Sequence, residues 1–349
     1  MELPSELVAI PDSPKPFRLL HLPSLAHDVI FSRVEIKDIY HLSKCSSRSR
    51  YAVKMFTRRQ KYNFNIHARE SSSSFAILDR IRFKSFYRSR ELDSVQLPAG
   101  DSLSTYSEDV WAETKKEILY FLDVFTKKVN RLEFYDTSKI TKMTEFLREK
   151  KVSPVDLVFH GGKNIINDEM YKYVLKEFKD AKKWSILASP SADFRFNDME
   201  PFTGDGISIL NADWLTVDNL TRCFTNVEKV RLWTPTRRYL KVPVLNQFLN
   251  AWRNGLRVGK LDLECECANF DLQSIFKNVP TTEVKRVELK YGKAVFYDGQ
   301  GFLIRQEESG VEALVYFRNI YTFSNHLICF TTNFRLLRDD ESDLGQIIS

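Results

Sequence analysis

The sequence predicts an α+β protein. A small N-terminal block of helices precedes a larger domain of alternating strands and helices, which ends in an antiparallel β meander. Three observations lead to this prediction. Apolar residues recur at helical spacing over residues 17–58, strand-like segments recur from residue 131 onward, and glycine-containing turns separate apolar runs near the C-terminus.

The composition is that of a folded protein with one large domain or two smaller ones. The chain has 349 residues, of which 43% are hydrophobic and 28% charged, and 26 phenylalanines supply core material. No apolar run approaches the length of a membrane span, and the N-terminus carries acids and prolines where a signal peptide would be basic. Five cysteines without framework spacing fit reduced thiols. We therefore expect a cytoplasmic or nuclear protein without membrane contact.

The N-terminal part of the chain predicts a flexible tail over residues 1–16 and three short helices over residues 17–58. Proline suits the first turn of a helix, and the apolar residues that follow fall at helical spacing. Three helices this short cannot build a core of their own, so they must rest on a partner, on the following domain, or on both. The candidates for contact with a partner are Leu22, Pro23, Leu25, Val29, Ile30, Ile39 and Leu42.

Residues 59–105 form a basic linker region in which at least one strand is expected. Twelve lysines and arginines stand against two acids between Arg48 and Arg90, and residues 79–90 alternate between apolar and basic side chains. The favoured interpretation is a solvated basic face beside a core. A nucleic-acid surface is the less favoured alternative. It would use Arg58, Arg59, Arg80, Arg82, Lys84 and Arg88.

Residues 106–337 are expected to form one α/β domain of repeated units. Ser107 or Asp109 could cap a first helix over residues 110–128. Seven strand candidates follow, mostly separated by helix-like segments, and strand–turn–helix units of 20–29 residues are typical of leucine-rich-repeat solenoids. An ordinary layered α/β sheet remains the alternative. The strand candidates are centred on Glu133, Leu157, Ile186, Ile209, Arg231, Asp262 and Val287.

The C-terminal part of this domain has a different pattern. Apolar runs between residues 293 and 317 are separated by Asp298-Gly299 and Ser309-Gly310, which are hairpin signals. An antiparallel meander there would close the open edge of a solenoid. Residues 338–349 form an acidic tail.

Few residues of the sequence suggest catalysis or metal binding. Cys265 and Cys267 could share one face of a strand, but a zinc site needs four ligands, and His160 and His326 have no companions in the sequence. Metalloprotease, nucleophile-elbow and dinucleotide motifs are missing. We therefore expect no metal, no cofactor, and no enzymatic activity of the chain itself.

Aromatic and arginine residues near one strand end suggest a protein-binding patch. The four tryptophans at positions 184, 214, 233 and 252 have core packing as their default role. The third ends a strand candidate and precedes a basic loop, and Trp with Arg makes good interface anchors. The expected patch is Trp233, Arg237, Arg238 and Tyr239.

Two segments resemble known families. Leu22-Pro23, Val29-Ile30, Ile39, Leu42 and the ending "SKCSSRSR" are similar to an F-box, and the lead-in "PFRLLHLP" resembles its nematode-expanded branch. The segments "LTVDNLTRCFTNVEKVRLW", "LNQFLNAWRNG", "KLDLECE" and "KYGKAVFYDGQGFLI" resemble the type 2 F-box-associated domain. Together these resemblances cover about 200 residues in the right order.

The resemblance implies a substrate receptor of an SCF-type ubiquitin ligase. The F-box would bind a Skp-type adaptor, and through it a cullin, while the C-terminal domain would hold an unidentified client protein. Two departures motivate an alternative. Leu25 stands where many F-boxes have an acid, and Val34-Glu35 where many have two prolines. A protein-binding scaffold that has lost ligase assembly would tolerate both changes.

Overall fold

The computed structural model of the 349-residue chain describes most of residues 19–347, with the backbone alone in parts of several strands. The expected tails at residues 1–16 and 338–345 lie outside the described residues, as does the expected turn at Asp298-Gly299. The described ranges are 19–60, 62–69, 72–78, 83–89, 103–106, 108–160, 166–233, 241–257, 262–267, 271–289, 292–295, 300–320, 325–336 and 346–347.

The predicted N-terminal helical block is confirmed. A short 3-10 turn η1 (Leu19–His21) leads into α1 (Ser24–Phe31), α2 (Ile36–Cys45) and α3 (Ser47–Thr57). Pro23 is the N-cap of α1, directly before the helix, and the side chain of Ser46 caps α3 by accepting a hydrogen bond from the backbone N–H of Ser49 at 3.0 Å.

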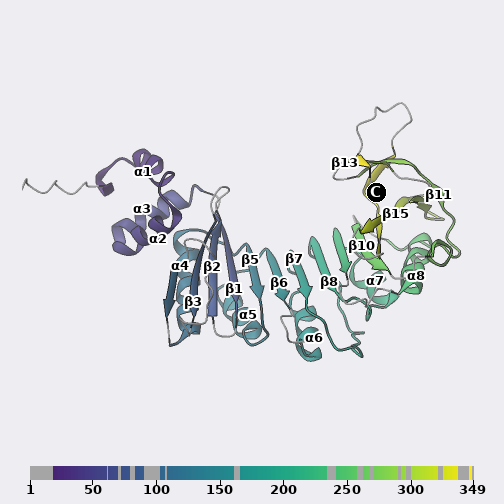
Figure 1. The fold of residues 1–349 in the computed structure, drawn as a ribbon, viewed down its shortest axis with the longest axis horizontal. Helices are drawn as coiled ribbons and strands as arrows, with labels where there is room; N and C mark the ends of the chain where they lie inside the picture. The colour runs from purple at the N-terminus through teal and green to yellow at the C-terminus, as the bar shows by residue number, and fades with distance from the viewer. Residues whose placement is uncertain are drawn as a thin grey trace, which may run out of the picture.

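A sheet of 14 strands dominates the rest of the described chain (Figure 1). One edge of it is formed, from the outside inward, by β4 (Leu103–Tyr106), β3 (Phe83–Ser89), β2 (Ser72–Leu78) and β1 (Asn63–Ala68). Next come β5 (Arg131–Phe134), β6 (Asp156–His160), β7 (Lys183–Leu187), β8 (Gly206–Leu210), β9 (Lys229–Trp233) and β10 (Asp262–Cys267). The far edge is formed by β16 (Asn325–Thr331), β15 (Glu312–Ile320), β14 (Gly301–Arg305) and β11 (Thr282–Glu283).

The strands β5 to β10 lie side by side in sequence order and are parallel. Each of them contains the residue on which a strand was predicted from the repeat spacing. The strand predicted around Val287 also exists, as β12 (Arg286–Leu289), but it is not the next member of this series. The place beside β10 is taken by β16, which pairs with it antiparallel.

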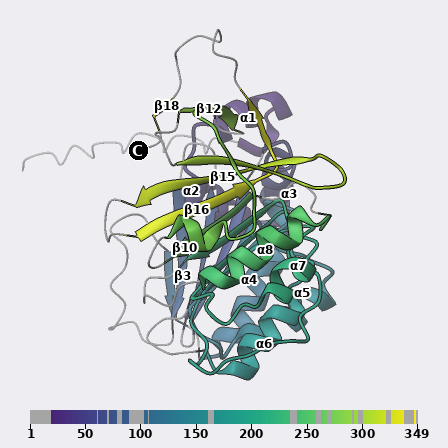
Figure 2. The same cartoon turned by 90° about the vertical axis from the view of Figure 1, so that its right-hand side faces the viewer.

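Helices cover one face of the sheet, as Figure 2 shows for α4 to α8. These are α4 (Val110–Val124), α5 (Ile140–Glu149), α6 (Asp168–Glu177), α7 (Val217–Cys223) and α8 (Val242–Arg253), followed by the short α9 (Leu272–Ile275). Asp109 is the N-cap of α4, one of the two caps predicted. The strands alternate accordingly, so that Leu132 and Phe134 are in the core under the helices while Glu133 is on the opposite face.

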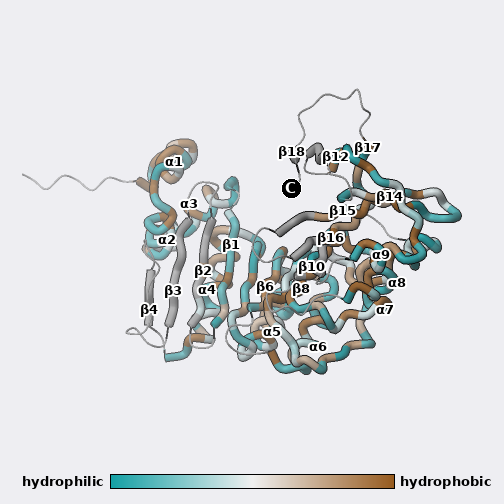
Figure 3. The backbone as a smooth tube through the Cα atoms, turned by 45° about the vertical axis from the view of Figure 1, so that its right-hand side comes forward, coloured by the Kyte–Doolittle hydropathy of each residue, from teal (hydrophilic) through white to brown (hydrophobic). Residues whose placement is uncertain are grey.

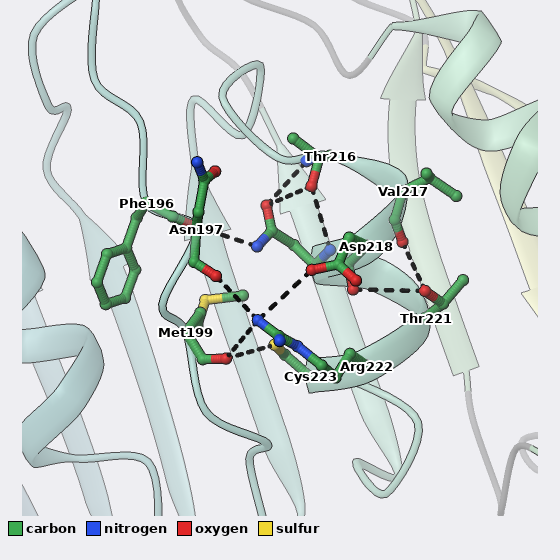
Figure 4. A network of polar contacts seen from close by, with 10 residues as sticks. Phe196, Asn197, Met199, Thr216, Val217, Asp218, Thr221, Arg222 and Cys223 are labelled. Carbon is green, nitrogen blue, oxygen red and sulfur yellow. Dashed lines mark hydrogen bonds and ion pairs between the residues drawn. The ribbon is translucent and has the colours of Figure 1, made fainter.

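An irregular segment takes the place of a helix between β7 and β8. Residues 188–205 run along α7, where Arg222 donates to the carbonyl oxygens of Asn197 at 2.8 Å and of Met199 at 3.2 Å (Figure 4). The thiol of Cys223 donates to Met199 at 3.2 Å, and burial raises its pKa. Side chains of the neighbouring unit therefore satisfy backbone groups that a helix would have satisfied internally.

The core continues without a break from the N-terminal helices to the end of the sheet. Trp184, Trp214 and Trp252 are buried in it, as expected by default for three of the four tryptophans. A second, four-stranded sheet at the C-terminal end has the order β17 (Phe334–Leu336), β12, β13 (Gly292–Val295), β18 (Gln346–Ile347). It buries Val287 and Leu314 in a separate small cluster.

Candidate functional site

The inner side of the N-terminal helices belongs to the core of this chain. Phe31, Ile36, Val53 and Phe56 are buried, and the rings of Phe31 and Phe56 meet edge to face with centroids 5.3 Å apart. An ion pair between Asp28 and an arginine at the end of α3 joins the first and third helices. The apolar residues on the inner side of these helices therefore pack within the chain.

The outer side of the same helices exposes large apolar residues. On α1, the exposed fraction is 74% for Leu25 and 55% for Val29, and these two residues are one turn apart. On α3, Tyr51 is 65% exposed and Met55 is 39% exposed, again one turn apart. Figure 3 shows the hydrophobic character of α1 in brown. Exposed apolar residues that are grouped on short helices indicate an interaction surface.

The residues predicted for adaptor contact fall into two groups. Leu25, Val29 and Pro23 are exposed, and Leu22, Ile30 and Leu42 are partly buried. Ile39 differs from the expectation, because only 2% of its surface is exposed and it packs in the core. Because it is buried in this core, Ile39 is not available to a partner in this structure.

The polar side of the helical block is fixed to α4. Tyr40 stacks on Phe121 with ring centroids 5.5 Å apart and donates to Glu117 at 3.2 Å, and Lys44 pairs with the same carboxylate at 3.2 Å. Thr57 donates to the carbonyl oxygen of Val124. These contacts seat the block on the following domain.

A second set of ion pairs strengthens this junction. Asp123 of α4 pairs with Arg50 at 2.9 Å and with Lys54. The hydrogen bond from Lys54, against the opposing effect of burial, holds the pKa of the Asp123 carboxyl below its ordinary value. The exposed residues of α1 and α3 are therefore presented on a base that is anchored through apolar, hydrogen-bonded and ionic contacts.

Tyr51 and Met55 were missed by the sequence reasoning. The partner set expected from the sequence ends at Leu42 and includes no residue of the third helix. The signal was present in its spacing, because Tyr51 and Met55 lie four residues apart and alternate with the buried pair Val53 and Phe56.

The other predicted patches lie largely outside the described residues. Arg237, Arg238 and Tyr239 are outside them, and of Trp233 only the backbone is described, paired with Leu210 at the end of β9. Arg80 and Arg82 are also outside, and Lys84 and Arg88 have a described backbone on β3. Among the residues expected for nucleic-acid binding, Arg59 forms an ion pair with Asp28.

The structure also gathers a cluster of polar residues on the face of the sheet that the helices leave uncovered. We call this face, over β1 and β5 to β9, the open face. His67 on β1 and His160 on β6 hydrogen-bond to one oxygen of Glu133 on β5, His67 through Nδ1 at 3.2 Å and His160 through Nε2 at 3.1 Å. The hydroxyl of Tyr135 donates to that oxygen at 2.7 Å, and Arg131 donates to the other at 2.5 Å.

Aromatic stacking completes this group. The rings of Tyr135 and His160 are stacked with centroids 4.3 Å apart and planes 7° apart, and the guanidinium of Arg69 lies over Tyr135 at 4.6 Å from its centroid. We call His67, Arg69, Glu133, Tyr135 and His160 the Glu133 cluster. His160 has no companions in the local sequence, and its contacts come from the neighbouring strand β5 and the residues that follow it.

The buried carboxylate of Glu133 stays ionised. Burial alone would raise its pKa, but the hydrogen bonds from His160, His67 and Tyr135 outweigh burial and hold the pKa far below the ordinary value of a glutamate. Burial, together with the neighbouring carboxylate of Glu133, raises the pKa of Tyr135 to about 12. The carboxylate and the phenol therefore keep one charge state each across the neutral range.

Searches for two other kinds of site gave no candidate. Among the described residues, no three or more histidines, cysteines, aspartates and glutamates are grouped so that they could hold a metal ion. Of the helices in the described part of the chain, none has the length and apolarity to cross a membrane.

Comparison with known proteins identifies the N-terminal helices. Residues 19–61 match the family model described as the F-box domain. A search of curated proteins and a search of solved structures each found no match. F-box domains bind Skp-type adaptors in SCF complexes. The chain therefore carries an F-box domain at residues 19–61, and this domain indicates a role as a ubiquitin-ligase adaptor.

Proposed function

We propose that the chain is a substrate receptor of an SCF-type ubiquitin ligase. The observation that carries the proposal is the two-sided use of the F-box helices. Their inner side is sealed in the core of this chain, while Leu25 and Val29 remain exposed on the outer side of α1. A Skp-type adaptor would cover that outer side and connect the receptor to a cullin.

The contact set differs from the one predicted from the sequence. Leu25, Val29 and Pro23 are exposed, and Leu22, Ile30 and Leu42 have part of their surface exposed. We add Tyr51 and Met55 and leave out the buried Ile39. Burial of this apolar surface against the adaptor would drive binding. About 400 Å² of buried apolar surface contributes on the order of 10 kcal/mol to the binding free energy before the costs of association.

The client would bind the domain that follows the F-box. We infer a leucine-rich-repeat-like solenoid related to the type 2 F-box-associated domain, supported by the parallel, sequential order of β5 to β10. In this proposal the antiparallel strands β14 to β16 close the end of the sheet, and the patch at Trp233, Arg237, Arg238 and Tyr239 remains a candidate client contact. The chain itself performs no chemistry, since a receptor contributes proximity to a ubiquitin-loading enzyme, inside the cytoplasm or nucleus.

The junction with α4 suits this function. A receptor must hold its client at a defined place relative to the ligase, and the contacts of Tyr40, Thr57 and Asp123 link the F-box helices to the first helix of the client-binding domain. A flexible linker at this point would spread the client over many positions.

The experiment is a binding assay between the purified chain and a Skp-type adaptor. The double variant Leu25→Asp Val29→Asp places two carboxylates on the contact surface, and we expect it to weaken binding at least tenfold. Leu119→Asp is the matched control, because Leu119 is an exposed leucine (42%) on α4, outside the F-box. Equal adaptor affinity of the wild type and the double variant would contradict the proposed contact.

The same assay separates the alternatives. A chain that binds no adaptor but retains a client would be the scaffold without ligase assembly, for which Leu25 and Val34-Glu35 are the motivation. A nucleic-acid binder would be retained on a polyanion column with an affinity that falls steeply as salt is added. Retention that does not depend on salt would remove this third possibility.

A further inference from the structure

The Glu133 cluster is a group of ionisable side chains on the open face to which the adaptor function assigns no role. It joins residues from three neighbouring strands, since β1 pairs with β5 and β5 pairs with β6. Glu133 is buried at its centre, whereas the side chains of His67 and His160 are 22% and 26% exposed. Hydrogen bonds to Glu133 therefore hold both imidazoles in place, and part of each imidazole remains exposed to solvent.

The hydrogen bonds to Glu133 determine which ring nitrogen of His67 and of His160 is not used in the contact with Glu133. An ionised carboxylate can only accept, so Nδ1 of His67 and Nε2 of His160 must be the donors. A neutral imidazole has one further nitrogen, which carries a lone pair. Nε2 of His67 and Nδ1 of His160 can therefore each take up a proton and then donate a hydrogen bond of their own.

The charges around the cluster favour an anion once these protons are present. The permanent positive groups on the strands packed together here are Arg69 beside β1, Arg131 on β5 and Lys183 on β7, and the negative groups are Glu133 and Asp156. Both carboxylates are ion-paired with Arg131, Glu133 at 2.5 Å and Asp156 at 3.1 Å. Two protonated imidazoles would add two positive charges at the outer side.

Two adjoining segments lie outside the described residues. They contain Glu70 and Lys163, which carry one charge of each sign. The other groups of the cluster do not titrate near neutrality, because Glu133 remains ionised and the pKa of Tyr135 is about 12. Histidine is the side chain whose ordinary titration falls between about pH 5 and 8. A change in the charge of the described groups of the cluster therefore requires a proton on an imidazole nitrogen.

We propose that the Glu133 cluster binds a carboxylate of the client protein and takes up protons from solvent when it does so. The proposal rests on the proposed receptor function and specifies the class of client, which is a protein with an exposed segment rich in aspartate or glutamate. The carboxylate accepts hydrogen bonds from the outer nitrogens of His67 and His160, beside the guanidinium of Arg69. No covalent bond changes in this step.

The test measures the affinity of the full chain for a fluorescent hexaglutamate peptide between about pH 6 and pH 8. The dye is attached to the α-amino group of the peptide, which would otherwise titrate near pH 8, and glutamate side chains do not titrate in this range, so a change in affinity reports on the protein. We expect binding about tenfold tighter at pH 6 than at pH 8, which corresponds to partial proton uptake by the two rings. A hexalysine peptide should not bind, and inorganic phosphate should compete only weakly.

Three variants separate the roles within the cluster. His67→Gln with His160→Gln retains an amide donor for Glu133 but cannot gain charge, so the pH dependence should disappear. Arg69→Gln should weaken binding at both pH values and leave the pH dependence unchanged. His41→Gln is the control, because His41 is an exposed histidine on α2, outside the cluster. NMR of the imidazole rings provides a second readout, in which the peptide should increase the protonated fraction of His67 and His160.

The result that would overturn the proposal is equal affinity at the two pH values, absence of binding at both, or a pH dependence that survives in the double histidine variant. The double variant should bind the Skp-type adaptor like the wild type. Failure of the wild type to bind the adaptor would count against the receptor function, while the peptide assay, which uses the chain alone, would still decide the carboxylate site.

Discussion

Replacement of Glu133 by glutamine tests how much the central carboxylate of the open face contributes to stability. The side chain accepts hydrogen bonds from Arg131, His67, His160 and Tyr135, and it is buried. Glutamine preserves the size, but it replaces one acceptor oxygen by an NH2 donor that faces other donors. We expect Glu133→Gln to lower the free energy of unfolding at pH 7 by about 2–4 kcal/mol.

The pH dependence of this loss has a definite sign. The pKa of Glu133 is lower in the folded chain than its ordinary value of 4.5, so the stabilisation is fully present above about pH 5. It is lost progressively as the pH falls below 4.5, because the unfolded chain then binds a proton that the folded chain excludes. The difference between wild type and variant should therefore shrink in acid.

The assay is urea unfolding followed by tryptophan fluorescence at several pH values from 3.5 to 7. Glu149→Gln is the matched control, since Glu149 is an exposed glutamate at the end of α5 and its replacement should change the unfolding midpoint little. A Glu133→Gln variant that is as stable as the wild type at pH 7, or equally destabilised at pH 3.5 and pH 7, would refute the reasoning.

Three further substitutions test the packing. Phe31→Ala should cost about 3–5 kcal/mol, because the ring is buried between α1 and α3, and hydrogen exchange should show the loosening in the F-box helices. Gly204→Ala should destabilise by about 1–3 kcal/mol, since the added Cβ would lie 2.1 Å from the carbonyl oxygen of Ala181, and an unchanged melting temperature would contradict that crowding. Thr216→Ala removes the N-cap of α7 and should cost about 1 kcal/mol in urea unfolding, whereas Thr216→Ser should cost less.

The parallel strands β5 to β10 were predictable because their signal is local. Short apolar segments such as those around Leu157 and Ile209 are bounded by turns and recur at regular spacing, and the structure has β6 and β8 at these positions. The irregular segment at residues 188–205, which replaces a helix, was harder to predict from the sequence. It depends on hydrogen-bond donors from α7, one unit further along the chain.

The partner-facing residues were predicted in part. Apolar spacing correctly predicts that α1 is a helix, but it cannot tell which apolar residue faces the chain and which faces outward. Ile39 and Leu25 have the same chemistry, and their exposed fractions of 2% and 74% follow from where α3 and α4 lie. A helix has an inner side only once its neighbours are placed.

The sequence by itself determined the helical block, the positions of β5 to β10 and the match to the F-box, because these depend on residues that are close together along the chain. Only the tertiary structure decided which apolar residues stay exposed and that Glu133 meets His67 and His160. The partners of Glu133 are 66 and 27 residues away in the sequence. They meet because the register of the parallel strands places His67 opposite Glu133, and places His160 two residues beyond Val158, which is opposite Glu133 on β6. No local pattern records that register.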